Sequence, residues 1–97
     1  MSNSVKHFCL DGNVINSLED FYDEVERKLT KDFESGHNLD AFNDLLRGGF
    51  GRFGYGEPIV LHWTDFKKSS AKLPSNKLSV ILEIIQDSEN VTFCPED

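Results

Sequence analysis

The fold is decided by the segment Pro58-Ile59-Val60-Leu61-His62-Trp63, which opens on a proline and continues as an almost uninterrupted apolar run. A short run of this kind is typical of a strand that is covered on both faces of a sheet. Two further apolar runs, at residues 5–10 and 91–94, have the length of strands and stand near the ends of the chain. We therefore expect three strands, and the turn pair Asp11-Gly12 closes the first.

Residues at helical spacing separate these strands. Helices are predicted at about residues 17–31 with Ser17 as N-cap, at about 38–47 with Gly48-Gly49 as the stop, at about 66–70 with Thr64 as N-cap, and after Ser75, which is the predicted N-cap of the last helix. Connections of this length favour parallel strand pairing and right-handed crossovers. The sequence predicts one α/β domain over residues 1–97, with a three-stranded parallel sheet and about four helices.

Composition narrows the class of function. The chain has 97 residues and a net charge of −7, which disfavours nucleic acid as the main partner. No apolar run approaches the ~20 residues of a membrane span, and the first residues lack the pattern of a secretory signal. Cys9 and Cys94 are expected to be buried free thiols, because free cysteine is usually buried. We expect a cytoplasmic protein with no metal or cofactor.

Negative charge is concentrated in two parts of the chain. Residues 1–46 carry ten acids and four bases, residues 83–97 carry five acids and no base, and residues 47–82 carry two acids and six bases. Asp40 and Asp44 stand four residues apart on one face of a predicted helix, where like charges cost about 0.2–0.5 kcal/mol. This charge indicates either a solvated surface or a face for a basic partner.

Three other groups of residues suggest alternatives. The loop 48–57, with Phe50, Arg52, Phe53 and Tyr55, has the residue types that stack on single-stranded RNA. Asp40, Asp44 and His37 could support acid–base catalysis if they shared a pocket. His7, Cys9 and His62 could lie on one sheet face as metal ligands, although strand histidines with a single partner are commoner.

Two motifs resemble the barstar family, the intracellular inhibitors of the secreted ribonuclease barnase. They are Gly36-His37-Asn38-Leu39-Asp40-Ala41-Phe42-Asn43-Asp44-Leu45-Leu46 and Pro58-Ile59-Val60-Leu61-His62-Trp63-Thr64-Asp65-Phe66. The resemblance implies strand order 1-2-3, which places the two cysteines about 10 Å apart, beyond disulfide reach. It also implies that the second helix plugs a ribonuclease active site, with Asp40 and Asp44 at the centre, Asn38 ordering the start of the helix and Gly48 at the rim.

The chain departs from the family pattern at several positions. Glu34 and Ser35 replace two tyrosines, Asn43 replaces a tryptophan between the two aspartates, and Gln86, followed by Asp87, replaces a glutamate. The residues predicted to face a partner are therefore Glu34, Gly36, His37, Asn38, Asp40, Asn43, Asp44, Gly48, Gln86 and Asp87. We expect a basic ribonuclease other than barnase, such as the C-terminal domain of a bacterial secreted or contact-delivered toxin, bound 1:1 by this chain as its immunity protein without any catalysis of its own.

Overall fold

A computed structural model of the chain describes residues 4–31 and 37–97. Its elements, in chain order, are strand β1 (Lys6–Leu10), the 3-10 helix η1 (Gly12–Val14), helices α1 (Leu18–Leu29) and α2 (Leu39–Arg47), strand β2 (Ile59–Trp63), helices α3 (Phe66–Ser70) and α4 (Ser75–Asp87), and strand β3 (Val91–Pro95). None of the helices in this part of the chain is long and apolar enough to cross a membrane.

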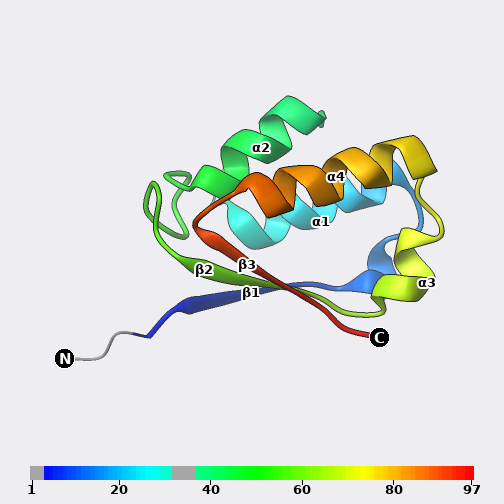
Figure 1. Ribbon diagram of the computed structural model, residues 1–97, viewed down its shortest axis with the longest axis horizontal. Helices are drawn as coiled ribbons and strands as arrows, with labels where there is room; N and C mark the ends of the chain where they lie inside the picture. Colours follow the sequence, from blue (N-terminus) through cyan, green and yellow to red (C-terminus); the bar gives the residue numbers. More distant parts are fainter. Residues whose placement is uncertain (1–3, 32–36) are drawn as a thin grey trace.

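The three strands form one parallel sheet in the order β1-β2-β3 (Figure 1). Phe8, Leu61 and Phe93 lie in register across it, and so do Cys9, His62 and Cys94. Each of the two long connections between strands contains two of the α-helices, and parallel pairing requires long crossovers of this kind. The predicted α/β class, the strand order and the number of helices are all confirmed.

Helices α1, α2 and α4 cover the same face of the sheet (Figure 1). Burial in β2 therefore alternates: Ile59, Leu61 and Trp63 are buried, whereas Val60 and His62 are half-buried. The prediction that the central strand is covered on both faces is wrong. Its two edges are paired with neighbouring strands, but its second face is open, and the apolar Val60 alone hid the alternation in the sequence.

The core lies between the sheet and these three helices. Phe21 of α1 packs against both Phe42 of α2 and Trp63 of β2, with ring centroids 5.2 and 5.3 Å apart. All three rings are almost completely buried, and burial of each large apolar side chain stabilises a fold by about 1.5–3 kcal/mol. The Trp63 indole Nε1 donates to Ser69 Oγ at 2.8 Å, so its polar atom is satisfied inside the core.

The first residues of the helices show which of the predicted N-caps are correct. Ser17 Oγ accepts from Asp20 N at 3.2 Å, which confirms it as the N-cap of α1. Thr64 does not cap α3, because its hydroxyl bonds Leu10 O and the N–H of Gly12. Ser75 is the first residue within α4, behind Pro74, so it is not a cap either.

The cysteines also differ from expectation. Cys9 is exposed and Cys94 is half-buried, and both thiols are free. They stand on either side of His62 on the open face of the sheet, so the prediction that they are buried is wrong. Their apolar neighbours in sequence point to the opposite face, because side chains alternate along a strand.

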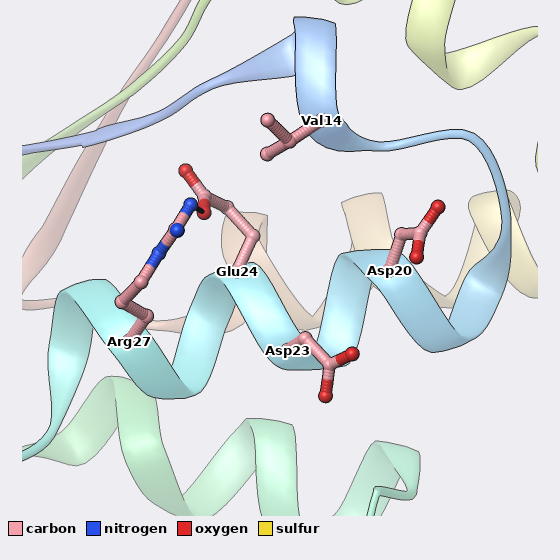
Figure 2. A pocket seen from close by; sticks show the side chains of 5 residues that line it. All are labelled: Val14, Asp20, Asp23, Glu24 and Arg27. Carbon is pink, nitrogen blue, oxygen red and sulfur yellow. Dashed lines mark hydrogen bonds and ion pairs between the residues drawn. The ribbon is translucent and has the colours of Figure 1, made fainter.

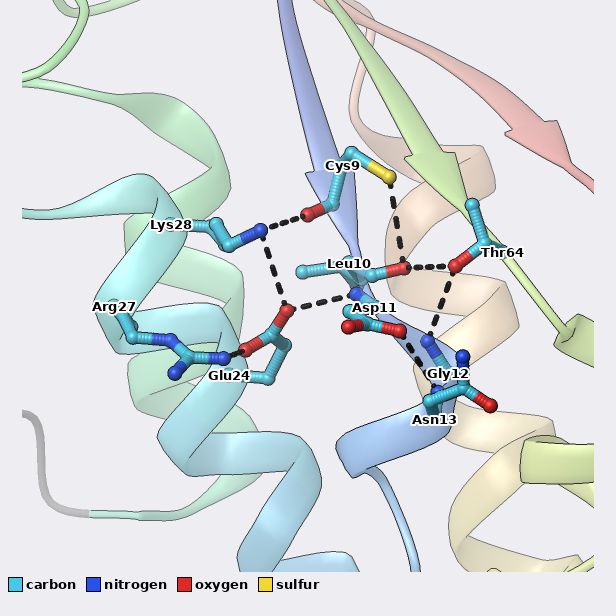
Figure 3. Close-up of polar contacts among 9 residues, drawn as sticks. All are labelled: Cys9, Leu10, Asp11, Gly12, Asn13, Glu24, Arg27, Lys28 and Thr64. Atoms are coloured by element: carbon cyan, nitrogen blue, oxygen red, sulfur yellow. Dashed lines mark hydrogen bonds and ion pairs between the residues drawn. The ribbon is translucent and has the colours of Figure 1, made fainter.

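A buried carboxylate joins α1 to the end of β1. The side chain of Glu24 is completely buried and accepts from the N–H of Asp11 at 2.7 Å (Figure 3). It also pairs with Arg27, and with Lys28 at 3.5 Å. Lys28 Nζ in turn donates to Cys9 O at 2.9 Å. Glu24 is thus fully occupied in holding the helix against the strand.

Candidate functional site

The first turn of α2 is fixed by its own sequence. Asn38 has extended backbone angles, and its side chain accepts from Ala41 N at 2.8 Å, as an N-cap does. Asp40 stands in the first turn, where the helix dipole favours negative charge. The helix therefore begins rigidly, just before its first aspartate.

The two faces of α2 differ sharply in burial. Phe42, Leu45 and Leu46 are buried against the rest of the core. Asp40 and Asp44 are exposed on the other side, and Asn43 between them is half-buried. Within residues 4–31 and 37–97, neither aspartate forms a hydrogen bond or an ion pair. The helix presents two aspartates whose carboxylates are available to another molecule.

The end of α2 depends on a glycine. Gly48 has φ +89, and a Cβ atom there would come within 2.3 Å of Gly54 O. The chain then folds back, with Gly56 N donating to Arg47 O at 2.6 Å. Gly48 is buried by this close approach, so it ends the helix and offers little surface to a partner.

Asn90 fastens the C-terminal end of α2 to the sheet. Its Nδ2 donates to Leu46 O at 2.8 Å and to Glu57 O at 3.2 Å. Gln86 and Asp87, at the end of α4, are both exposed and lie a few residues before Asn90 in the chain. Sequence reasoning missed Asn90, because a single asparagine between a helix and a strand reads only as a turn residue.

His37 faces α1 rather than solvent. Its ring lies 2.9 Å from a carboxylate oxygen of both Glu19 and Glu26 and 3.3 Å from Asp23, and it stacks on Tyr22. The hydrogen bond to Glu19 raises the pKa of His37; the charges of Glu26, Glu19 and Asp23 act in the same direction, and partial burial opposes them. His37 thus links the residues at the start of α2 to α1.

An open hollow of about 340 Å³ lies between the starts of α1, α2 and α4. His37 and Asp40 both line it, together with Tyr22 and Lys77, but Asp44 does not. This hollow therefore does not bring together the three residues of the acid–base alternative. The two ring nitrogens of His37 lie beside carboxylates of α1, at Glu19 and Glu26.

The loop 48–57 is compact. Phe53 is buried and contacts Phe8, with ring centroids 5.2 Å apart, and Phe50 is half-buried. Gly54 N donates to Glu57 at 2.8 Å, which lowers the pKa of that carboxyl. Tyr55 alone among the loop's aromatic residues is largely exposed, at 77%. The stacking surface predicted for RNA is thus reduced to one ring.

A smaller hollow of about 170 Å³ lies between η1 and α1 (Figure 2). Asp20, Asp23, Glu24 and Arg27 line it, with Val14 on the other side. Its acids are already engaged, because Asp20 accepts from Asn16 N at 3.0 Å and Glu24 pairs with Arg27. This hollow is part of the framework that supports α1.

The candidate metal ligands share the open sheet face but are not arranged around an ion. His7 Nδ1 lies 2.8 Å from His62 Nε2, and His62 Nδ1 lies 2.5 Å from Glu96. Cys9 points its thiol toward Leu10 O, at 3.9 Å. Among the described residues, no group of three such side chains could hold a metal.

Two of the residues predicted to face a partner, Glu34 and Gly36, lie outside the described residues. The others fall into two sets. Asp40, Asn43, Asp44, Gln86 and Asp87 lie on α2 or at the end of α4. His37, Asn38 and Gly48 flank α2, where each contributes to holding that helix in place.

Comparison with known families agrees with this arrangement. The family model for Barstar (barnase inhibitor) matches residues 5–92, which is most of the chain. The chain therefore belongs to the barstar family.

Proposed function

From the premise that this chain is a member of the barstar family, we propose that it inhibits a basic ribonuclease by placing α2 in the enzyme's active site. The observation that carries the proposal is the pair of exposed aspartates, Asp40 and Asp44, whose carboxylates form no hydrogen bond or ion pair in the part of the chain described. Like charges four residues apart destabilise a helix slightly, so a binding role accounts for keeping both.

The chemistry of the target explains why carboxylates suit it. A ribonuclease binds the phosphates of RNA with arginine, lysine and histidine side chains. Carboxylates on a helix satisfy the same cationic groups but offer no phosphodiester bond to cleave. Asp40 and Asp44 occupy the phosphate sites in this proposal, and the chain acts stoichiometrically, without turnover.

The contacts that hold α2 in the fold favour binding as a rigid helix. Asn38 caps its start, Asn90 bonds its last turn, and Gly48 ends it against Gly54. A helix that is already ordered loses little conformational entropy when it binds. Gln86 and Asp87, at the end of α4, form the second part of the proposed contact surface.

The partner we propose is a ribonuclease other than barnase. Asn43 stands where the family pattern has tryptophan, and Gln86 stands where it has glutamate, so the contact surface differs at its centre and at its edge. A bacterial toxin with a basic C-terminal ribonuclease domain fits this surface. The chain would then serve as its immunity protein, in a 1:1 complex inside the producing cell.

The test is retention followed by an activity assay. The chain is immobilised, an extract of the native host is passed over it, and any retained basic protein is separated and assayed for RNA cleavage. Adding the free chain back should suppress cleavage with an end point at one molecule per enzyme. Barnase, titrated in parallel, should be inhibited more weakly than the retained enzyme.

A matched pair of double variants separates position from net charge. Asp40→Asn with Asp44→Asn should abolish suppression. Asp65→Asn with Asp97→Asn also removes two negative charges, but near α3, where Asp65 makes no capping bond. This variant should suppress RNA cleavage as the wild type does. The proposal is wrong if both double variants inhibit equally, or if the retained protein has no ribonuclease activity.

A further inference from the structure

A basic hollow of about 450 Å³ opens where the start of β1, Lys31 and the loop 48–57 meet. The residues that line it are Lys6, His7, Phe8, Lys31, Gly51 and Arg52. None of them belongs to α2 or α4, so the hollow is separate from the surface proposed to bind the ribonuclease. It concentrates cations in a chain whose net charge is −7.

Backbone contacts hold the walls of the hollow in place. Lys31 N donates to Phe50 O at 3.0 Å, and Arg52 Nε donates to Thr30 O at 2.6 Å. Lys6 Nζ donates to Arg52 O at 3.0 Å. Gly51, at φ +110, allows the loop to pass so close to Lys31 that a Cβ atom would lie 2.8 Å from that residue's Cβ. The head groups of Lys6 and Arg52 and the backbone of Lys31 are therefore positioned before any ligand arrives.

Little of this positive charge is neutralised within the described residues. Lys6 pairs with Glu57 at 3.5 Å. Lys31 and Arg52 form no ion pair with any carboxylate in that part of the chain, and both are exposed. The Arg52 guanidinium uses only its Nε in the bond to Thr30, so its two terminal nitrogens remain available as paired donors.

We propose that this hollow binds a phosphate-bearing ligand. Lys31 and Arg52 have no carboxylate partner among the described residues, and Lys6 and His7 lie beside them. Such a group suits a terminal phosphate, which has two negative charges and several acceptor oxygens, better than it suits a ligand with a single carboxylate. The half-buried ring of Phe8 adds an apolar wall, which suits a phosphate that carries an organic group. The ligand class is thus a nucleotide or an inorganic polyphosphate, and the shared chemistry is the phosphate.

The test follows backbone amide NMR signals of the full chain during titration with pyrophosphate and, separately, with uridine 5′-monophosphate. We expect saturable shifts confined to the residues of the hollow, which weaken as salt screens the charges. Tighter binding of the nucleotide, with shifts at Phe8, assigns the organic phosphate as the ligand. Equal binding of both assigns the phosphate group alone.

Three variants test whether the phosphate binds to the side chains of this hollow. Lys31→Gln and Arg52→Gln should each weaken binding about tenfold or more, because each removes a charge-assisted hydrogen bond. Lys67→Gln with Lys68→Gln, on the exposed surface of α3, should leave it within about twofold. The side chain of Lys31 forms no hydrogen bond or ion pair among the described residues, and Gln keeps its Cβ atom beside Gly51, so Lys31→Gln does not threaten the fold.

Two results would overturn the proposal. One is the absence of saturable shifts with either phosphate. The other is an equal loss in the α3 double variant, which would show that the phosphate responds to overall charge alone. Neither result bears on ribonuclease inhibition, because the experiment contains no ribonuclease.

Discussion

The acidic residues of helices α1 and α2 differ in whether they contact other groups of the protein. Every acid of α1 contacts another group: Glu19, Asp23 and Glu26 contact His37, Asp20 bonds the N–H of Asn16, and Glu24 is buried with Arg27. The aspartates of α2 form no such contact within the described residues. The acids of α1 thus contribute to holding the molecule together, whereas those of α2 are the ones we propose for contact with a partner.

The largest expected effect tests the α2 side of this comparison. Asp44→Ala should weaken the complex with the ribonuclease by about 2–5 kcal/mol, the general range for truncating a desolvated charge pair, of which barnase and its inhibitor are a well-known case. Calorimetric titration of the retained enzyme measures the loss. A loss below about 1 kcal/mol in both Asp44→Ala and Asp40→Ala would remove these residues from the site.

A comparable effect, on folding rather than binding, tests the α1 side. Glu24→Ala should lower the free energy of unfolding by about 3 kcal/mol, because it leaves the N–H of Asp11 and the head group of Arg27 without their carboxylate. Urea denaturation followed by circular dichroism measures this. Asp44→Ala is the control, and it should unfold within about 0.5 kcal/mol of the wild type.

A smaller effect depends on pH. The pKa of His37 is raised in the folded protein, so its contacts with the carboxylates of α1 stabilise the fold fully below the pKa of the unfolded chain, about 6.5. That contribution is lost as pH rises through the folded-state pKa. His37→Asn, which tolerates the left-handed backbone at φ +49, should remove this dependence. Urea midpoints at pH 5.5 and 8.5 give the comparison, and parallel pH profiles for the two proteins would contradict it.

The smallest effect is expected at an exposed acid of α1. Asp23→Asn removes one of three carboxylates around His37, and its side chain is 66% exposed. Both stability and binding should change by less than about 1 kcal/mol, because exposed pairs contribute little. A loss of affinity equal to that of Asp44→Ala would show that α1 also contacts the enzyme, which would break the contrast between the helices.

The strands and helices followed from the spacing of apolar residues, and the strand order followed from the family resemblance. Spacing alone could not separate the acidic pairs. Glu19 and Asp23 stand four residues apart just as Asp40 and Asp44 do. What distinguishes the first pair is His37, which the fold brings from 18 residues away to contact Glu19. Sequence distance gives no sign of such a contact.

Burial was harder to predict at strands and caps than at helices. Cys9 and Val60 sit in apolar runs, but helices cover one face of the sheet only. Thr64 has the residue type of a cap, but its hydroxyl is drawn into the contact between Leu10 and Gly12. In each case a tertiary contact decides the outcome, and local sequence does not encode it.

Within residues 4–31 and 37–97, the strand order β1-β2-β3 leaves each outer strand with one edge that no other strand pairs. Such edges invite a further strand from another chain, and so risk aggregation. Each outer strand here is only five residues long; β1 opens on a charged lysine, Lys6, and β3 closes on Pro95, which has no N–H to donate. These features guard a small open sheet against adding to itself at high concentration, so they favour a chain that stays free to associate through α2, as we propose.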